Sequence, residues 1–258
     1  FLLFMIGTAV TLTLVVELIY LPGDIGRMNT VFKFYLESWI LFALSAGVCL
    51  GWVVKSLRYW NNRLEFFWQA AFFILVASAA LFTLLGTADK IRDRMAPNAP
   101  HTLDGMAYMK YATYYDMGVE MDLEEDYQVI QWMQENIEGS PVILEGQAFE
   151  YRWGNRYTVY TGLPGVVGWN WHQRQQRAIL RDNRVQERVD AVGTFYLTED
   201  LAYVVDFIEQ YDVSYIVLGQ LERAFFPGPG LEKFAAYEGQ LWKEVYRYKS
   251  TIVYEVLD

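Results

Sequence analysis

Five polar side chains gather where an apolar segment of this sequence ends. They are Glu17, Asp24, Arg27, Asn29 and Lys33. A carboxylate inside an apolar segment is costly to bury, so such a residue is usually paired or functional. The pattern supports two alternatives. Either the cluster binds a ligand, or Glu17 pairs with Arg27 or Lys33 and only fixes the loop.

A second cluster follows an apolar run at residues 141–147, which predicts a buried strand. Its members are Glu145, Arg156, Trp169, Trp171, His172 and Arg177. Loops after strands are where α/β domains place their binding sites. Aromatic faces stack on sugar rings or enter a membrane interface, and arginine binds phosphate through paired hydrogen bonds. A sugar-phosphate site is one interpretation, and a patch that docks onto a membrane domain is the other.

Other chemistries find little support. The sequence contains no Walker loop, dinucleotide fingerprint or catalytic triad. Its single cysteine and two histidines cannot form a zinc cluster of the usual kind. The run 219–223 follows a predicted strand and favours an ion pair over the edge of a site. No cofactor is predicted, although a divalent cation oriented by Asp24 or Glu17 is an alternative.

Three apolar segments must position these clusters. They are predicted membrane-spanning helices at residues 1–21, 31–54 and 66–85. A helix needs about 20 apolar residues to cross the hydrocarbon core, and three such runs in succession are unusual for a soluble core. Residues 1–88 are therefore predicted to be a multi-pass domain of the cell membrane, with membrane lipid as a partner.

The basic residues between the second and third of these helices indicate the orientation. Lys55, Arg58 and Arg63 lie in this loop, whereas the preceding loop has one Asp and one Arg. Loops rich in Lys and Arg stay in the cytoplasm, so the C-terminal domain is predicted to be extracytoplasmic. The two polar clusters would then share one side, with Arg27 and His172 on a common cleft.

The rest of the chain has the composition of a soluble protein. Residues 89–121 are predicted to be a linker, and residues 122–258 an α/β domain with a mixed, partly parallel sheet. A helix is expected at 123–137. The expected strands are 141–147, 157–161, 213–218, 242–248 and 251–256. The formal net charge of −10 lies mostly after residue 100 and argues against nucleic acid as a partner.

Four stretches resemble an uncharacterised family of large prokaryotic membrane proteins, the Chlor/Arch YYY membrane proteins. They contain Arg27-Met-Asn-Thr-Val-Phe-Lys-Phe-Tyr, Thr102-Leu-Asp-Gly-Met-Ala-Tyr-Met, Thr161-Gly-Leu-Pro-Gly-Val-Val-Gly-Trp and Val213-Ser-Tyr-Ile-Val-Leu-Gly. This family is similar to the GT-C membrane glycosyltransferases, which transfer sugars from polyprenyl-phosphate donors. The resemblance implies that a further N-terminal membrane part precedes residue 1 and carries the catalytic base.

The resemblance implies a glycosyltransferase that acts on a lipid-linked sugar. Arg27, Lys33 or Arg177 would hold the lipid phosphate, while the tryptophans of the second cluster and His172 would line the sugar site. The alternative is a non-enzymatic structural or accessory subunit that docks onto other membrane subunits. A transporter is a third alternative, and the few charges at mid-bilayer weaken it.

Overall fold

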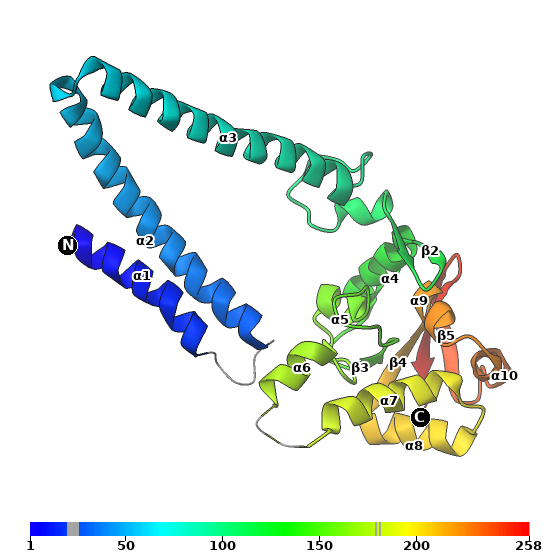
Figure 1. The fold of residues 1–258 in the computed structure, drawn as a ribbon. Coiled ribbons are helices and arrows are strands. Elements are labelled where there is room, and N and C mark those ends of the chain that lie inside the picture. Colours follow the sequence, from blue (N-terminus) through cyan, green and yellow to red (C-terminus); the bar gives the residue numbers. More distant parts are fainter. Residues whose placement is uncertain (20–25, 179, 181, 258) are drawn as a thin grey trace. The chain divides into compact units, whose positions relative to one another are not determined.

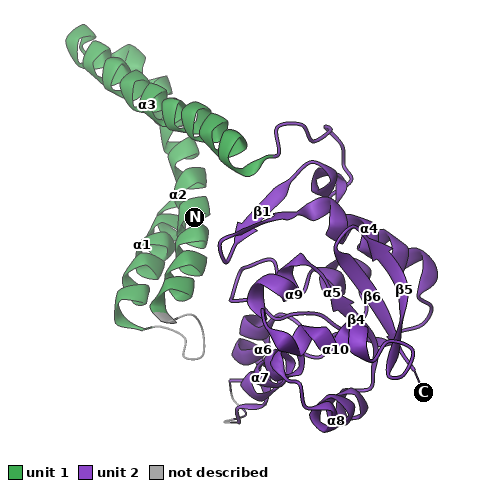
Figure 2. Ribbon diagram, turned by 90° about the vertical axis from the view of Figure 1, so that its right-hand side faces the viewer, with its two compact units in different colours: residues 1–95 green, residues 96–258 purple. Residues whose placement is uncertain are grey.

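The computed structural model describes residues 1–19, 26–178, 180 and 182–257 (Figure 1). The chain divides into two compact units, residues 1–95 and residues 96–258 (Figure 2). The first unit is helical, and the second contains both sheets. The two polar clusters belong to different units, and their common cleft stays a prediction.

Among the residues that the structure describes, three α-helices build the first unit. They are α1 (Leu2–Leu18), α2 (Gly26–Ser56) and α3 (Asn62–Arg94), with a short 3-10 helix, η1 (Leu57–Tyr59), after α2. Two stretches are long and apolar enough to cross a membrane, Arg27–Tyr59 and Asn62–Arg94. α1 has 17 residues, fewer than the roughly 20 needed. Two of the three predicted membrane helices thus have sufficient length, and the count of three stays a prediction.

The helices of the first unit differ in how many of their side chains are buried. α1 packs against α2, where the Ser38 hydroxyl donates a hydrogen bond to the carbonyl of Ala9 at 3.3 Å. α3 buries none of its residues, so its apolar side chains point outward all around the helix. A helix that is apolar on every side needs either a protein core or a membrane around it.

The second unit is built on a four-stranded sheet with the order β3-β4-β6-β5. The strands are β3 (Val142–Leu144), β4 (Val213–Leu218), β5 (Trp242–Tyr248) and β6 (Thr251–Val256). β3 pairs parallel with β4, and β6 pairs antiparallel with β4 and β5. The mixed, partly parallel sheet that the sequence predicts is confirmed.

Helices cover both faces of this sheet (Figure 1). Ile216 and Leu218 of β4 enter one core with side chains of α7 (Arg184–Leu197) and α8 (Leu201–Tyr211). Val217 between them enters a second core with side chains of α4 (Leu123–Asn136) and α5 (Arg156–Thr161). Neighbouring residues of β4 face different cores because successive side chains of a strand point to opposite faces of the sheet. The remaining helices of this unit are η2 (Ala107–Lys110), α6 (Asn170–Gln176), α9 (Gln220–Phe225), η3 (Pro229–Glu232) and α10 (Lys233–Ala236).

Two segments differ from what the sequence predicts. Residues 157–161, the expected second strand, form the helix α5. Residues 89–121, the expected linker, include η2 and β1 (Thr113–Asp116), which pairs with β2 (Val119–Asp122) in a separate hairpin. Met109 of η2 is completely buried in the core beside α4, so this part of the segment belongs to the folded unit.

Candidate functional site

The loops that follow β3 and β4 lie at one edge of the sheet, because the two strands run parallel. Glu145 comes directly after β3, and Glu222 lies in α9, which follows β4. In open α/β sheets, ligands bind outside the carboxyl ends of the strands. The sequence therefore places two carboxylates where such a fold usually forms a site.

A buried arginine links these carboxylates. Arg156 donates from Nε to Asp126 at 2.8 Å and from its two terminal nitrogens to Glu222 at 3.2 and 2.9 Å. Glu145 lies 3.8 Å from the same guanidinium. All four side chains are at most 7% exposed. This arginine–carboxylate network joins four separate chain segments inside the protein and cannot touch a ligand in this state.

The pKa values of Glu145 and Glu222 shift in opposite directions. Burial raises the pKa of Glu145, against the opposing charge of Arg156 and the hydrogen bonds from Thr158 and Tyr157. Burial acts in the same direction on Glu222, but the charge and hydrogen bonds of Arg156 outweigh it and lower the pKa. Of these two glutamates, Glu145 takes up a proton more readily.

Glu145 also explains why α5 is a helix. Its carboxylate accepts hydrogen bonds from the backbone N–H of Tyr157 at 3.1 Å and from the backbone N–H and hydroxyl of Thr158 at 2.9 and 2.6 Å. The first N–H groups of a helix have no partner within it, and a carboxylate there is favourable. Asn155 precedes α5 without a capping side-chain hydrogen bond, so Glu145 supplies the cap from another segment.

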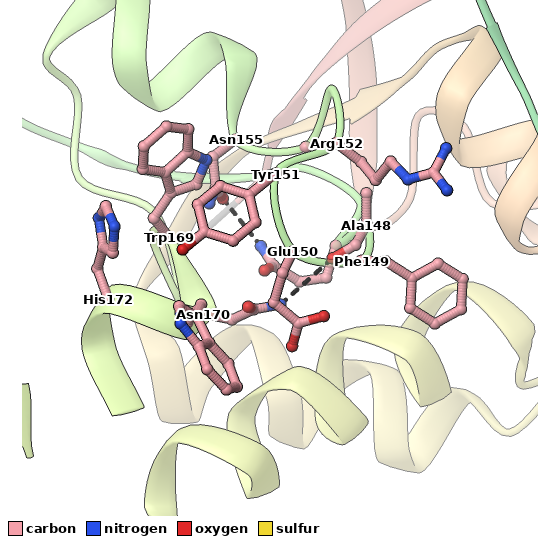
Figure 3. Close-up of a pocket in the computed structure, with 12 residues that line it drawn as sticks. Ala148, Phe149, Glu150, Tyr151, Arg152, Asn155, Trp169, Asn170 and His172 are labelled. Atoms are coloured by element: carbon pink, nitrogen blue, oxygen red, sulfur yellow. Dashed lines mark hydrogen bonds between the residues drawn. The ribbon is translucent and has the colours of Figure 1, made fainter. Parts of the chain in front are cut away.

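A pocket lies between the loop after β3 and the start of α6 (Figure 3). Its lining residues are Gln147, Ala148, Phe149, Glu150, Tyr151, Arg152, Gly154, Asn155, Trp169, Asn170, Trp171 and His172. The Asn170 amide donates to the carbonyl of Ala148 at 3.2 Å and holds the two walls together. The cavity volume is about 20 Å³, roughly the space of one water molecule. A larger ligand would therefore lie on the rim.

Three rings form one side of this rim. The His172 ring lies 5.1 Å from that of Trp169 and 6.4 Å from that of Tyr151, centre to centre, and is nearly perpendicular to both. Trp169 is 45% exposed and Tyr151 66% exposed. Figure 3 shows the three side chains beside one another, with Phe149 and Arg152 on the other side of the loop. The rim thus offers aromatic surface next to an imidazole.

Three side-chain N–H donor groups of α6 are buried without an acceptor among the described residues. They are Nε1 of Trp171, which lines the pocket, Nε of Arg174 and Nε2 of Gln175. Leaving a buried donor unsatisfied costs about 1–3 kcal/mol. Ser45 Oγ in the first unit is also buried without a partner among the described residues. A water molecule or a ligand atom would satisfy the donors of α6 equally well.

The second polar cluster therefore separates into three places. Glu145 and Arg156 lie in the buried network, whereas Trp169, Trp171 and His172 line the pocket. Arg177, at the end of α6, lines a different cavity together with residues of α7. Glu222 pairs with Arg156 of another segment rather than within the 219–223 run, and Arg223 donates to the carbonyls of Leu218 and Gly219.

The first polar cluster forms the expected ion pair. Glu17 pairs with Arg27, which also donates from Nε to the carbonyl of Val16 at 3.2 Å. Both charged side chains are about half exposed. Asn29 and Lys33 lie in the first turns of α2, and Asp24 lies outside the described residues.

Metal chemistry gains no support from the described residues. Within them, no three His, Cys, Asp or Glu side chains gather in a way that could hold a metal ion. The divalent cation stays an alternative.

Sequence reasoning missed Asp126 and Trp153. Asp126 accepts hydrogen bonds from Arg156, from the Tyr157 hydroxyl at 2.5 Å and from Nε1 of Trp153 at 2.7 Å. It lies in the first turn of α4, where acidic residues are common for helix-dipole reasons alone. No local signal in the sequence distinguishes it from its acidic neighbours Glu124 and Glu125.

The N-terminal residues match a known family. Residues 1–42 match the model of a family described as uncharacterized membrane protein (DUF2298). The resemblance to the YYY membrane proteins is confirmed over this stretch. No curated protein matches the sequence.

One similar solved structure is the C-terminal globular domain of oligosaccharyltransferase (AfAglB-S2) from Archaeoglobus fulgidus. The identity is 13%, the match covers 51% of this chain and 95% of that domain, and the TM-score is 0.34.

Proposed function

We propose that this chain is the C-terminal part of a membrane glycosyltransferase that uses a polyprenyl-phosphate-linked sugar. The resemblance to the YYY membrane proteins, and through them to GT-C enzymes, supplies the reaction class. The rim formed by Trp169, Tyr151 and His172 supplies the observation that carries the proposal. Exposed aromatic faces beside hydrogen-bonding groups suit a sugar ring, which has apolar faces and a polar edge.

The residues of the soluble unit would have separate roles in sugar binding. Trp169 and His172 would contact the sugar at the rim. Glu145 and Arg156 would act as positioning residues, because their network fixes the loop that carries Tyr151. None of these residues is proposed as the catalytic base.

Arg27, Lys33 or Arg177 would hold the lipid phosphate, and Glu17 or Asp24 would orient the acceptor or a cation. The soluble unit would be extracytoplasmic, because the Lys55–Arg63 loop is basic.

Donor binding by the full chain tests the sugar site. The protein is held in a polyoxyethylene detergent, which carries neither sugar nor phosphate, and titrated with a radiolabelled polyprenyl-phosphate-linked sugar and with the sugar-free polyprenyl phosphate. Trp169→Ala is expected to weaken binding of the sugar-linked donor about tenfold, or about 1.4 kcal/mol. Its affinity for the sugar-free lipid should not change.

Tyr115→Ala is the matched control. Tyr115 is an exposed aromatic residue of β1 that does not line the pocket, so its removal should leave the affinity for both lipids unchanged. If Trp169→Ala and Tyr115→Ala bind the donor equally well, the rim does not bind sugar and this function is wrong.

The accessory-subunit alternative rests on the exposure of the same region. Phe149 and Tyr151 are 64% and 66% exposed, and large exposed apolar side chains are common in docking surfaces. In that case a photo-crosslinking amino acid at position 149 would capture another membrane subunit, and Trp169→Ala would reduce the yield of this adduct without any effect on donor affinity.

A further inference from the structure

A second cavity of the soluble unit is lined by three arginines. Arg177 comes from the end of α6, and Arg184 and Arg188 come from α7. The cavity volume is about 290 Å³, close to the lower limit of roughly 300 Å³ for small-molecule sites. The other lining residues are Gly165, Val166, Val167, Gln173 and Val185, so no acidic side chain lines the cavity among the described residues. The cavity is therefore locally positive, although the chain as a whole has a formal net charge of −10.

The arginines are held by their neighbours. Arg188 donates to the carbonyl of Val166 at 3.0 Å, and its guanidinium lies 5.3 Å from the centre of the Tyr211 ring. Arg177 donates to Gln173, and Arg184 pairs with Asp182 at 2.6 Å. A guanidinium has five N–H donors, and the Val166 carbonyl occupies only one of those on Arg188. Donors therefore remain for a ligand in a geometry that the fold has already arranged.

The start of α7 carries two arginines, of which Arg184 is partly neutralised by its pair with Asp182. Arg184 is the first residue of the helix, and Asn183 makes no capping hydrogen bond with its side chain. A positive charge at a helix N-terminus opposes the helix dipole, which favours anions there. Arg184 and Arg188 are also four positions apart on one helix, where like charges repel each other. Glu187 shares this first turn but does not line the cavity.

We propose that this arginine cavity binds a phosphate group. Arginine recognises phosphate through paired, charge-assisted hydrogen bonds, and an anion in this cavity would reduce the repulsion between Arg184 and Arg188. The chemistry fits the phosphate of a lipid headgroup and equally a soluble phosphate. α6 contributes to the aromatic pocket at its start and to the arginine cavity at its end. One ligand with a sugar and a phosphate would therefore use both ends of this helix.

The idea that one ligand occupies both cavities rests on the proposed function. The phosphate-binding test of the arginine cavity does not depend on it. The full chain, in polyoxyethylene detergent, is dialysed to equilibrium against radiolabelled inorganic phosphate and inorganic pyrophosphate. Neither probe contains sugar, so binding is independent of the aromatic pocket. If phosphate binds and Trp169→Ala leaves donor binding intact, the proposed function fails while the phosphate site stands.

Arg184→Gln/Arg188→Gln is expected to raise the dissociation constant for pyrophosphate about 100-fold, or about tenfold for each arginine. Arg247→Gln is the control for an arginine charge lost elsewhere, because it removes one positive charge from an exposed side chain on β5, and it should bind like the parent protein. Circular dichroism and thermal unfolding check the fold. If the double variant does not fold, Arg184→Gln alone, on a 61% exposed side chain, should still weaken binding about tenfold.

Competition identifies the source of the phosphate. If polyprenyl phosphate displaces the bound probe, the site serves a lipid headgroup, and if it does not, the site serves a soluble phosphate. Both results require the phosphate site. The proposal is overturned if the parent protein binds neither probe, or if the folded double variant binds pyrophosphate as tightly as Arg247→Gln does.

Discussion

Arg156 donates hydrogen bonds to both carboxylate oxygens of Glu222, at 3.2 and 2.9 Å, although 66 positions separate the two residues. The side chains are 1% and 0% exposed. Their pairing fastens the start of α5 to α9, and the backbone N–H of Gly146 in the loop after β3 donates to the same carboxylate at 2.8 Å. Glu222 therefore joins the loops after β3 and β4.

Removing one partner of this pair should destabilise the soluble unit strongly. Arg156→Met leaves three buried carboxylates without their cation, and breaking a buried ion pair costs about 3–5 kcal/mol. Arg247→Met is the control, since the Arg247–Glu244 pair is half exposed and such pairs contribute about 0–1 kcal/mol. Denaturant unfolding, followed by tryptophan fluorescence, compares the two. Equal losses would show that the network contributes no more than a surface pair.

Lys233 should make stability depend on pH in the alkaline range. It is 4% exposed, and its ammonium donates to the carbonyls of Tyr196, Thr198 and Gly230. Burial lowers its pKa from 10.5 to about 8. Between these two values the unfolded chain binds more protons than the folded one, so the free energy of unfolding should rise with pH, by at most about 1.4 kcal/mol per unit.

Lys233→Met should remove this slope. Denaturant unfolding at several values between pH 8 and pH 10.5 measures it for both proteins. If the parent and the variant have the same slope, the three carbonyls keep the ammonium charged and the pKa of Lys233 is not lowered.

The Glu17–Arg27 pair should be a modest structural contact. Both side chains are about half exposed, so Glu17→Gln should lower the free energy of unfolding by about 1 kcal/mol or less. Arg27→Gln in the same protein should restore much of the loss. A double-mutant cycle in detergent measures the coupling. If Glu17→Gln instead leaves stability intact and abolishes donor binding, Glu17 serves the site rather than the loop.

Membrane orientation can be read from cysteine labelling in intact cells. In a Cys49→Ala background, Asn62→Cys should be protected from an impermeant thiol reagent, and Gln240→Cys should react. Gln240 is exposed and avoids Gly239, whose φ of 78° would strain a side chain. The other cysteine is placed at position 62 and not at 61, because the Asn61 side chain caps α3. The reverse pattern of labelling would invert the predicted topology.

Much of the fold is visible in local patterns. The strands β4, β5 and β6 begin and end where the sequence predicts, because β-branched and aromatic residues alternate there between clear turns. The helix α4 also begins as predicted, since the Asp122 side chain accepts a hydrogen bond from the N–H of Glu124.

The segment at 157–161 shows why the rest is not visible. Tyr-Thr-Val-Tyr-Thr has a strong strand preference, yet Glu145 holds its first N–H groups in a helical turn. A contact across 12 and 13 positions overrides local propensity. The same limit hides Asp126 from the candidate site, because its importance lies in contacts 27 to 31 positions away.

The position of β6 has a consequence during synthesis. β6 is the last strand of the sheet along the chain, yet it lies between β4 and β5 and bonds to both. Until residues 251–256 leave the ribosome, β4 has only the three-residue strand β3 as a partner, and β5 has no partner in the final strand order. Long-range strand pairing is slow, and unpaired edges invite association between chains. A nascent chain stalled before residue 251 would expose both edges, so the synthesis of residues 251–256 decides whether this sheet is completed or its edges associate with other chains.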